Sequence, residues 1–257
     1  MFAALTLVSL VLVADPVTES ANIAADDAAA AFESFGYEPL FDGETLDGWV
    51  VPEGDNGHWK VVDGVIDYDA ASEAEGDKSL RTKDSFGDFI CELEWRLMPV
   101  GPLQETPIIL ADGTYLLGPD GKQVKIVRQC PDSGIYLRGE PRAQLNLWNW
   151  TTGSGEMYGF RNRAQTELLR SKLTPDFNAD KPLGEWNRFT IVLVGRTLTL
   201  LVNDHLVIEQ AELPEDFPLE GPLVLQHHGG RDADGNLKPS SSVVQFRNIR
   251  LKRLAAE

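Results

Sequence analysis

The sequence predicts an all-β protein, an antiparallel β-sandwich of the jelly-roll kind. Two observations favour this fold class. Helical periodicity is scarce from residue 38 onward, and short alternating segments recur between Gly, Asp, Asn and Pro residues. The chain has 257 residues, a length that a single β-sandwich commonly reaches. A core of that size needs neither disulfides nor metals to be stable.

The strand segments can be followed in order along the chain. HWKVVDGVIDY predicts two strands joined at Asp63-Gly64, a dipeptide that two-residue hairpin turns prefer. FGDFICELEWRLM predicts a longer strand, because its residue types alternate cleanly between apolar and polar. On that strand Cys91, Leu93 and Trp95 share one face and point into the core.

The second half of the chain continues this pattern. RFTIVLVGRTLTLLVNDHLVIEQ predicts three strands, with turns at Gly195 and at Asn203-Asp204. SSVVQFRNIRLKRL predicts a closing strand with an irregularity at Arg247-Asn248. Only FRNRAQTELLRSKL could form a helical turn or two. The architecture is therefore expected to consist of sheets, with almost no helix.

Two segments are additions to the predicted sandwich. Residues 99–130 contain Pro and Gly at intervals and predict a projecting hairpin, near 103–128. Residues 229–241 form a polar loop that directly follows a pair of histidines. Long loops beside a rigid sandwich often shape a binding site.

The first 25 residues are typical of a signal peptide. MFAALTLVSLVLVA is uncharged and apolar, too short for a membrane span of about 20 residues but suited to a signal-peptide h-region. The alternative is a buried first strand. Residues 26–37 form an acidic linker of small residues, and residues 38–257 form a single domain. We therefore expect export to the periplasm or outside the cell, where Cys91 and Cys130 could form one disulfide.

The charge of the chain restricts its partners. It has 40 acidic and 23 basic residues, a net charge of −17. Such a surface repels phosphate backbones and anionic lipids, so neither nucleic acid nor a membrane is expected as a partner. A neutral partner such as a carbohydrate fits this charge. The sequence does not determine the oligomeric state.

Four predicted strands each have an apolar face and an opposite face of polar and aromatic residues. These strands lie in CELEWRL, DSGIYLRG, RAQLNLWNW and LVLQHH. If they belong to one sheet, its outer face presents eight side chains together. They are Glu94, Tyr136, Arg138, Gln144, Asn146, Trp148, Gln226 and His228.

This set of side chains is typical of a carbohydrate site. Amide, guanidinium and carboxylate groups form directional hydrogen bonds to hydroxyls, and the faces of Trp and Tyr pack against sugar rings. The alternative is an ordinary solvated sheet face, on which polar residues simply alternate outward. Such a face is normally rich in Lys, Thr, Glu and Ser, so the observed composition favours a sugar site.

His228 is the candidate general base. It is the one residue of this face whose unperturbed pKa lies near neutrality. His227 points the other way or into the loop, and we expect it to bind substrate from there. Glu156 lies on a Gly-rich loop after the RAQLNLWNW strand and could reach the site as a third catalytic group. DADGN, at residues 232–236, resembles half a calcium loop but lacks the downstream acid and predicts a turn.

Phosphate-binding loops, dinucleotide fingerprints, serine nucleophile elbows and zinc-ligand spacings are absent from the sequence. No single strand carries a closely spaced carboxylate pair. A glycosidase whose two carboxylates come from separate strands remains an alternative.

Seven motifs in order resemble one known family. They are LFDGETLDGWV, WKVVDGVI, SFGDFICELEWRL, DSGIYLRG, GEWNRFTIVLVGRTLTLLVND, GPLVLQHHG and VQFRNIRL, within residues 38–254. The chain resembles the 3-keto-disaccharide hydrolases, also described as 3-keto-glucoside 1,2-lyase/3-keto-2-hydroxy-glucal hydratase domains. The resemblance implies a concanavalin A-like or LamG-like jelly roll. It also implies an exported enzyme that acts on glycosides already oxidised to a ketone at carbon 3.

The resemblance also implies roles for individual residues. A 3-ketone acidifies the hydrogen on carbon 2, so a base can remove it and expel the group on carbon 1. His228 matches the histidine of the family pattern LQDHG and would be that base. Arg138 of SGIYLRG would be the electrophilic partner, and Gln144, Asn146 and Gln226 would bind hydroxyls.

Three positions depart from the family pattern. Gln144 and Asn149 stand where the family commonly has carboxylates, and His227 replaces the aspartate of LQDHG. A divalent metal that used these acids would need other ligands, such as Glu94, Glu156 and the histidines. Otherwise the chain works without a metal, or is a non-catalytic, lectin-like carbohydrate-binding module.

Overall fold

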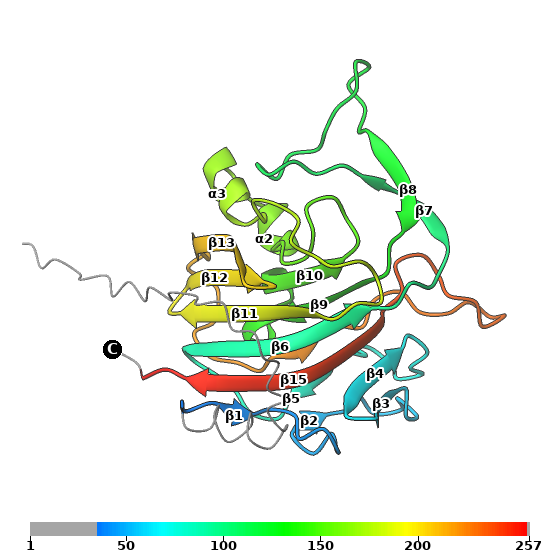
Figure 1. Cartoon of the computed structure of the whole chain (residues 1–257), viewed down its shortest axis with the longest axis vertical. Helices are drawn as coiled ribbons and strands as arrows, with labels where there is room; N and C mark the ends of the chain where they lie inside the picture. The colour runs from blue at the N-terminus through cyan, green and yellow to red at the C-terminus, as the bar shows by residue number, and fades with distance from the viewer. Residues whose placement is uncertain (1–34, 256–257) are drawn as a thin grey trace, which may run out of the picture. The chain divides into compact units, whose positions relative to one another are not determined.

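The structure is a computed structural model that describes residues 35–255. The signal peptide expected over residues 1–25 and nearly all of the linker lie outside the described residues. Residues 36–257 form one compact unit. Every strand pair in the described part is antiparallel, and two sheets pack face to face (Figure 1). The predicted antiparallel β-sandwich is confirmed.

The larger sheet has eight strands. Their order is β13-β12-β11-β6-β15-β4-β3, and β1 also pairs with β15. These strands are β1 (Glu38–Pro39), β3 (Trp59–Val62), β4 (Val65–Asp69), β6 (Phe89–Leu97), β11 (Asn187–Val194), β12 (Thr197–Val202), β13 (His205–Glu212) and β15 (Val243–Arg253).

The smaller sheet has five strands in the order β10-β9-β14-β5-β2. They are β2 (Trp49–Val50), β5 (Leu80–Thr82), β9 (Asp132–Tyr136), β10 (Gln144–Trp148) and β14 (Val224–Leu225). The predicted hairpin is a separate two-stranded ribbon that projects from the sandwich (Figure 1), formed by β7 (Leu103–Pro107) and β8 (Lys125–Gln129). Of two short helices, α3 (Glu167–Lys172) lies within the segment expected to be helical, residues 160–173, and α2 (Tyr158–Arg161) overlaps its start. Two 3-10 turns cover Leu137–Gly139 and Pro141–Ala143.

The local sequence explains these strands and turns. Residues of β6 alternate strictly between buried and half-buried, as the FICELEWRL pattern predicts. Asp63 and Gly64 both have positive φ, 51° and 76°, which suits the tight turn between β3 and β4. The expected irregularity in β15 is a register shift between Arg247 and Arg250, with Asn248 at φ 51°.

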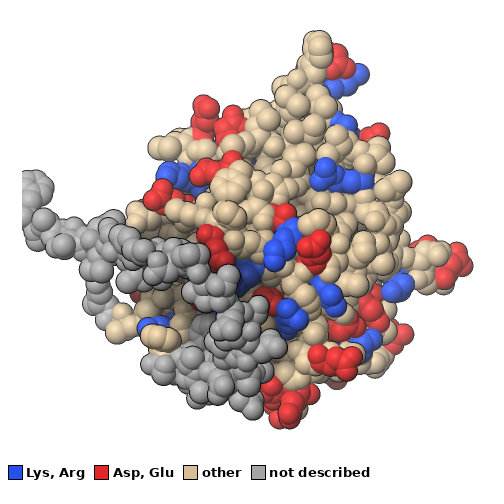
Figure 2. Space-filling model, in the orientation of Figure 1, with Lys and Arg blue, Asp and Glu red and all other residues tan. Residues whose placement is uncertain are grey.

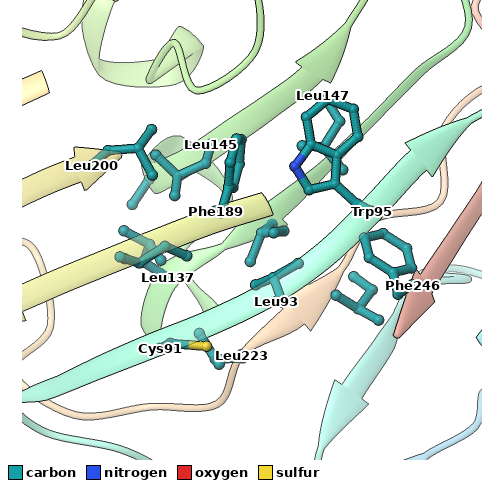
Figure 3. Packing of buried hydrophobic residues seen from close by; sticks show 14 of the residues in the cluster. Cys91, Leu93, Trp95, Leu137, Leu145, Leu147, Phe189, Leu200, Leu223 and Phe246 are labelled. Carbon is teal, nitrogen blue, oxygen red and sulfur yellow. The ribbon is translucent and has the colours of Figure 1, made fainter. Parts of the chain in front are cut away.

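The hydrophobic core fills the space between the sheets (Figure 3). Trp95 of β6 and Phe189 of β11 come from the larger sheet, and their rings meet edge to face with centroids 5.4 Å apart. Leu145 of β10 packs from the smaller sheet. Cys91 lies in this core, and both it and Cys130 are buried free thiols, so the possible disulfide between them is not formed. Within residues 35–255 no helix is long and apolar enough to span a membrane.

Candidate functional site

The outer face of the five-stranded sheet gathers polar side chains from neighbouring strands. In β9 and β10, Tyr136 pairs with Gln144, and Gly134 pairs with Asn146. The backbone N–H of Gln226 donates to the Gly134 carbonyl at 2.8 Å, which extends the β14–β9 pairing beyond β14. Paired residues of neighbouring strands share a face. Six predicted site residues therefore share this outer face: Tyr136, Gln144, Asn146, Trp148, Gln226 and His228.

A hydrogen bond orients the amides on this face. Gln144 Nε2 donates to Gln226 Oε1 at 2.7 Å, so the oxygen of the Gln226 amide is turned toward Gln144. Burial raises the pKa of Tyr136 to about 12, so its hydroxyl keeps its proton. A protonated hydroxyl on this face can donate a hydrogen bond to a ligand. Gly134 gives Gln144 room, since a Cβ there would lie 2.5 Å from Gln144 Nε2.

His228 has a defined tautomer. Its Nδ1 lies 2.7 Å from the carbonyl oxygen of Ser240. A carbonyl only accepts, so Nδ1 carries the proton and Nε2 of the neutral ring has a free lone pair. The ring is exposed, and the His228 backbone N–H donates to Ser242 Oγ at 2.7 Å. His228 is thus a positioned base facing solvent.

The glycine that follows His228 is needed for this arrangement. Gly229 has φ 70°, a left-handed conformation that glycine adopts without strain. A Cβ at Gly229 would also lie 2.6 Å from Ser241 Oγ. The 229–241 loop can therefore fold back and bring the Ser240 carbonyl onto the imidazole.

His227 points away from the outer face, as the strand alternation predicts. Its ring points toward β4, where Nδ1 lies 2.6 Å from the Tyr68 hydroxyl. Tyr68 in turn stacks on Trp59, with centroids 3.9 Å apart. Burial, helped by the charge of Lys78, lowers the pKa of His227 to about 4. His227 is a neutral packing residue at this position and does not join His228 on the outer face.

Glu94 is also not where the strand pattern predicted. It lies on β6 in the larger sheet, and its carboxylate accepts from Arg247 Nε at 2.6 Å. Alternation assigns a residue to one face of its own strand, but it does not say to which sheet that strand belongs. Glu94 instead belongs to a surface on which basic and acidic side chains alternate, as they do over the face seen in Figure 2.

Arg138 cannot act as a free electrophile. It has φ 50°, which breaks the strand alternation just after β9, and it is buried. A guanidinium has five N–H donors. Five hydrogen bonds engage the Arg138 side chain, two to the carbonyl of Gly87, one each to those of Gly195 and Pro218, and one to the carboxylate of Asp88. Its role in this structure is to join loops.

Glu156 lies at the edge of the site, but its side chain is buried. The Asn146 N–H donates to the Glu156 carbonyl at 3.0 Å, which places Glu156 alongside β10. Its carboxylate is fully buried and forms an ion pair with Arg161. Burial raises the pKa of Glu156 to about 7, while the positive charge of Arg161 opposes the shift. The rings of Tyr115 and Tyr158 lie against the Arg161 guanidinium.

Trp148 is the last residue of β10, and Asn149 follows it next to the site. Trp148 is buried, stacks on Trp150 with centroids 4.0 Å apart, and donates from Nε1 to the Gly153 carbonyl at 2.8 Å. Asn149 Nδ2 donates to the Gln129 carbonyl of β8. Asn149 thereby joins the 99–130 hairpin to the end of β10, and Trp148 holds the loop that follows β10. The accessible part of the face is formed by Tyr136, Gln144 and His228.

Asp132 is a site residue that the sequence argument missed. It begins β9, pairs with Trp148 across the sheet, and shares the outer face with Tyr136. Ser242 Oγ accepts from the His228 backbone N–H and donates to the Asp132 carbonyl, both at 2.7 Å. Burial raises the pKa of Asp132 to about 7, and the charge of His228 opposes the shift. The same alternation could have found it, because Asp132 lies four residues before Tyr136 in DSGIY.

A resident metal does not fit the described residues. No three His, Cys, Asp or Glu side chains within residues 35–255 come close enough together to hold a metal ion. The alternative ligand set of Glu94, Glu156 and the histidines is divided between two sheets.

Comparison with known proteins identifies the family. A family model described as the 3-keto-alpha-glucoside-1,2-lyase-like domain matches residues 36–252. The chain belongs to this family. A 3-keto-disaccharide hydrolase of Bacteroides thetaiotaomicron is 27% identical over 241 residues, which cover 85% of this chain and 79% of the relative. The family is one of carbohydrate hydrolase-type enzymes.

Solved structures show the same fold. Two proteins from Parabacteroides distasonis ATCC 8503, described as glycosyl hydrolases, superpose on most of this chain. One has a TM-score of 0.52 and 22% identity and covers 85% of this chain and 84% of its own. The other has a TM-score of 0.54 and 16% identity, with coverages of 87% and 96%.

Proposed function

We propose that this family member cleaves 3-keto-glycosides by β-elimination across carbons 1 and 2, with His228 as the general base. The observation that carries the proposal is the hydrogen bond from His228 Nδ1 to the Ser240 carbonyl. It leaves Nε2 unprotonated and exposed on a face that also presents Tyr136 and Gln144. The family and the relative named a 3-keto-disaccharide hydrolase support this choice of substrate.

The reaction follows from the acidity that the ketone creates. His228 Nε2 takes the hydrogen from carbon 2, and the electron pair of that bond forms the carbon 1–carbon 2 double bond as the carbon 1–oxygen bond breaks. Water then adds to carbon 1 and a proton returns to carbon 2, so the net result is hydrolysis. A positioned general base typically contributes about 10²–10⁴-fold to such a step.

The ligand would be bound by the amides and by Tyr136. Negative charge develops on the oxygen at carbon 3 during proton abstraction, and a preorganised donor stabilises it. The Tyr136 hydroxyl is the proposed donor, because burial raises its pKa to about 12 and it keeps its proton. Arg138 has no such part in the proposal, since its donors bind backbone carbonyls and Asp88.

A non-catalytic carbohydrate-binding module is the alternative function, and one experiment separates the two. The protein is incubated with a 3-keto-disaccharide, and release of the reducing sugar is followed for the wild type and for His228→Ala. An enzyme should lose about 10²-fold or more in turnover with its substrate affinity largely retained. A binding module would show no turnover in either form. His205→Ala, which removes an exposed histidine at the start of β13, serves as the control.

We also propose that the protein is exported. The apolar, uncharged residues 1–14 and the small-residue segment after them support a cleaved leader and a periplasmic or extracellular enzyme. N-terminal sequencing of the mature protein from its native host tests this, since a chain that retains Met1 would contradict it.

A further inference from the structure

The carboxyl group of Asp132 has an unusual environment for a buried acid. Oδ1 is inaccessible to solvent and has no hydrogen-bond partner among the described residues. Buried polar atoms are nearly always hydrogen-bonded in folded proteins, and exceptions often mark catalytic or ligand-binding groups. Neither arginine nor lysine forms an ion pair with Asp132 within residues 35–255. Oδ1 therefore lacks a partner within residues 35–255, and a ligand would bond to it once the groups that cover this oxygen move aside.

Asp132 lies beside the proposed base. The two residues belong to neighbouring strands of one sheet, and Ser242 Oγ bridges the His228 N–H and the Asp132 carbonyl. Residue alternation places the Asp132 side chain on the same face as Tyr136 and Gln144. The Gln144 side chain lies over Gly134, so a sugar ring that contacts these groups would lie on top of the Gln144 amide.

We infer that Asp132 is the second proton-transfer group of this site, the acid that protonates the departing oxygen and then the base that activates water. This inference rests on the proposed elimination. This role accounts for an acidic side chain on the outer face that has no cationic partner. It also provides a group that the elimination needs and that His228, occupied with the carbon 2 hydrogen, does not supply.

The proton balance closes over the two half-reactions. In elimination, His228 gains the carbon 2 proton while Asp132 gives its own proton to the glycosidic oxygen, so a neutral alcohol or sugar leaves. In hydration, ionised Asp132 takes a proton from the water that adds to carbon 1, while protonated His228 returns one to carbon 2. Both residues end in their starting states, and no other reactant is consumed.

The electrostatic surroundings agree with this role. Burial raises the pKa of Asp132 to about 7, so the acid and the carboxylate are both populated near neutrality. The charged groups around it are His228 after β14, and Glu156 with its partner Arg161 beyond β10. Because Glu156 is paired with Arg161, its charge is largely balanced there.

The test compares two leaving groups in the Asp132→Asn variant. A 3-keto-disaccharide expels a poor leaving group that needs a proton, whereas 4-nitrophenyl 3-keto-glucoside expels a stable phenolate that does not. We follow release of the leaving group in a single turnover, which precedes hydration, and expect it to slow about 10²-fold or more for the disaccharide and less than about 10-fold for the nitrophenyl substrate. Exchange of the carbon 2 hydrogen with solvent should persist, because His228 is intact.

A matched control removes another buried carboxylate. Asp55 is buried, and its Oδ1 also has no partner, but it lies before β3 and accepts from the Trp59 N–H. Asp55→Asn should leave the ratio of the two rates unchanged. Equal losses on both substrates in Asp132→Asn would overturn the inference, because a merely structural residue does not distinguish leaving groups. Wild-type protein without carbon 2 exchange would instead defeat the proposed elimination itself.

A measurement on the wild type makes the test independent of how well the variant folds. With the disaccharide, the rate should fall above a pKa of about 7 as Asp132 loses its proton. With the nitrophenyl substrate this alkaline fall should be missing. The same alkaline fall with both substrates would refute the assignment of Asp132.

Discussion

His228 Nδ1 lies 2.7 Å from the carbonyl oxygen of Ser240, so a backbone group decides which nitrogen of the imidazole can act as a base. Enzymes often use a carboxylate for this orienting role, and a carboxylate would also raise the basicity of the ring. A carbonyl fixes the tautomer without adding charge. That suits a base that must release its proton again in the hydration step.

Tyr136→Phe tests the donor proposed for the oxygen at carbon 3. Loss of a preorganised donor should lower kcat by roughly 10²-fold, because the hydroxyl acts on charge that develops in the transition state. Substrate affinity should change much less. Steady-state kinetics with a 3-keto-disaccharide measure both, and Tyr158→Phe, at a partly exposed residue against Trp148, is the matched control. A change confined to KM would contradict the assignment.

Arg138→Met should reduce stability and leave the chemistry unchanged. The side chain joins Gly87, Gly195 and Pro218, and its removal leaves those carbonyls and the Asp88 carboxylate short of donors. We expect the free energy of unfolding to fall by about 3 kcal/mol or more, as when one partner of a buried ion pair is removed. Urea unfolding measures this loss.

Turnover per folded molecule should stay within about threefold of the wild type, since ordinary destabilisation acts on the folded fraction. Arg247→Met is the control, because that arginine forms a surface ion pair with Glu94 on the other sheet. A large loss of kcat in folded Arg138→Met would contradict this expectation and indicate that Arg138 takes part in catalysis.

His227 should make stability depend on pH. Its folded-state pKa is lowered to about 4, mainly by burial, and the ordinary value is about 6.5. Between these values the unfolded chain binds a proton that the folded chain does not, so stability is full above pH 6.5 and is lost as the pH falls toward 4. Thermal melts of His227→Gln across this range should show a weaker dependence on pH than wild type. The exposed His205→Gln control should keep the wild-type dependence.

Much of the fold could be predicted because it depends on local rules. The alternation in β6 and the Asp63-Gly64 turn follow from residue types within a few positions of one another. The sheet to which a strand belongs is set by long-range pairing, so Glu94 was assigned to the wrong surface. Arg138 adopts a left-handed conformation that is uncommon for a non-glycine residue, and no residue-type rule anticipates it.

The site was predictable where alternation continued without interruption. It placed Tyr136, Gln144 and Gln226 on one face, and the hydrogen bond between the two glutamines follows from that placement. It could not reveal that the Ser240 carbonyl fixes the His228 ring, because that contact depends on how the 229–241 loop folds back. The alternation that places Tyr136 on the outer face also places Asp132 there, at the first residue of β9.

Exchange at carbon 2 distinguishes elimination from direct displacement. If His228 removes the carbon 2 hydrogen, product formed in heavy water must carry deuterium there, and His228→Ala should abolish the exchange. A substrate deuterated at carbon 2 should also react more slowly where abstraction limits the rate. A glycosidase with two carboxylates never breaks that bond and would show neither effect.

Asp132 and Glu156 are two carboxyl groups near one site, so a two-carboxylate mechanism has to be tested against elimination. Glu156, however, is fully buried and paired with Arg161, so it is poorly placed to attack a sugar or to activate water. Product without deuterium at carbon 2, together with a Glu156→Gln variant that loses turnover while remaining folded, would favour the two-carboxylate mechanism. Deuterium at carbon 2 in the wild type and in Glu156→Gln would leave elimination as the mechanism that accounts for an exposed, unprotonated Nε2 on His228.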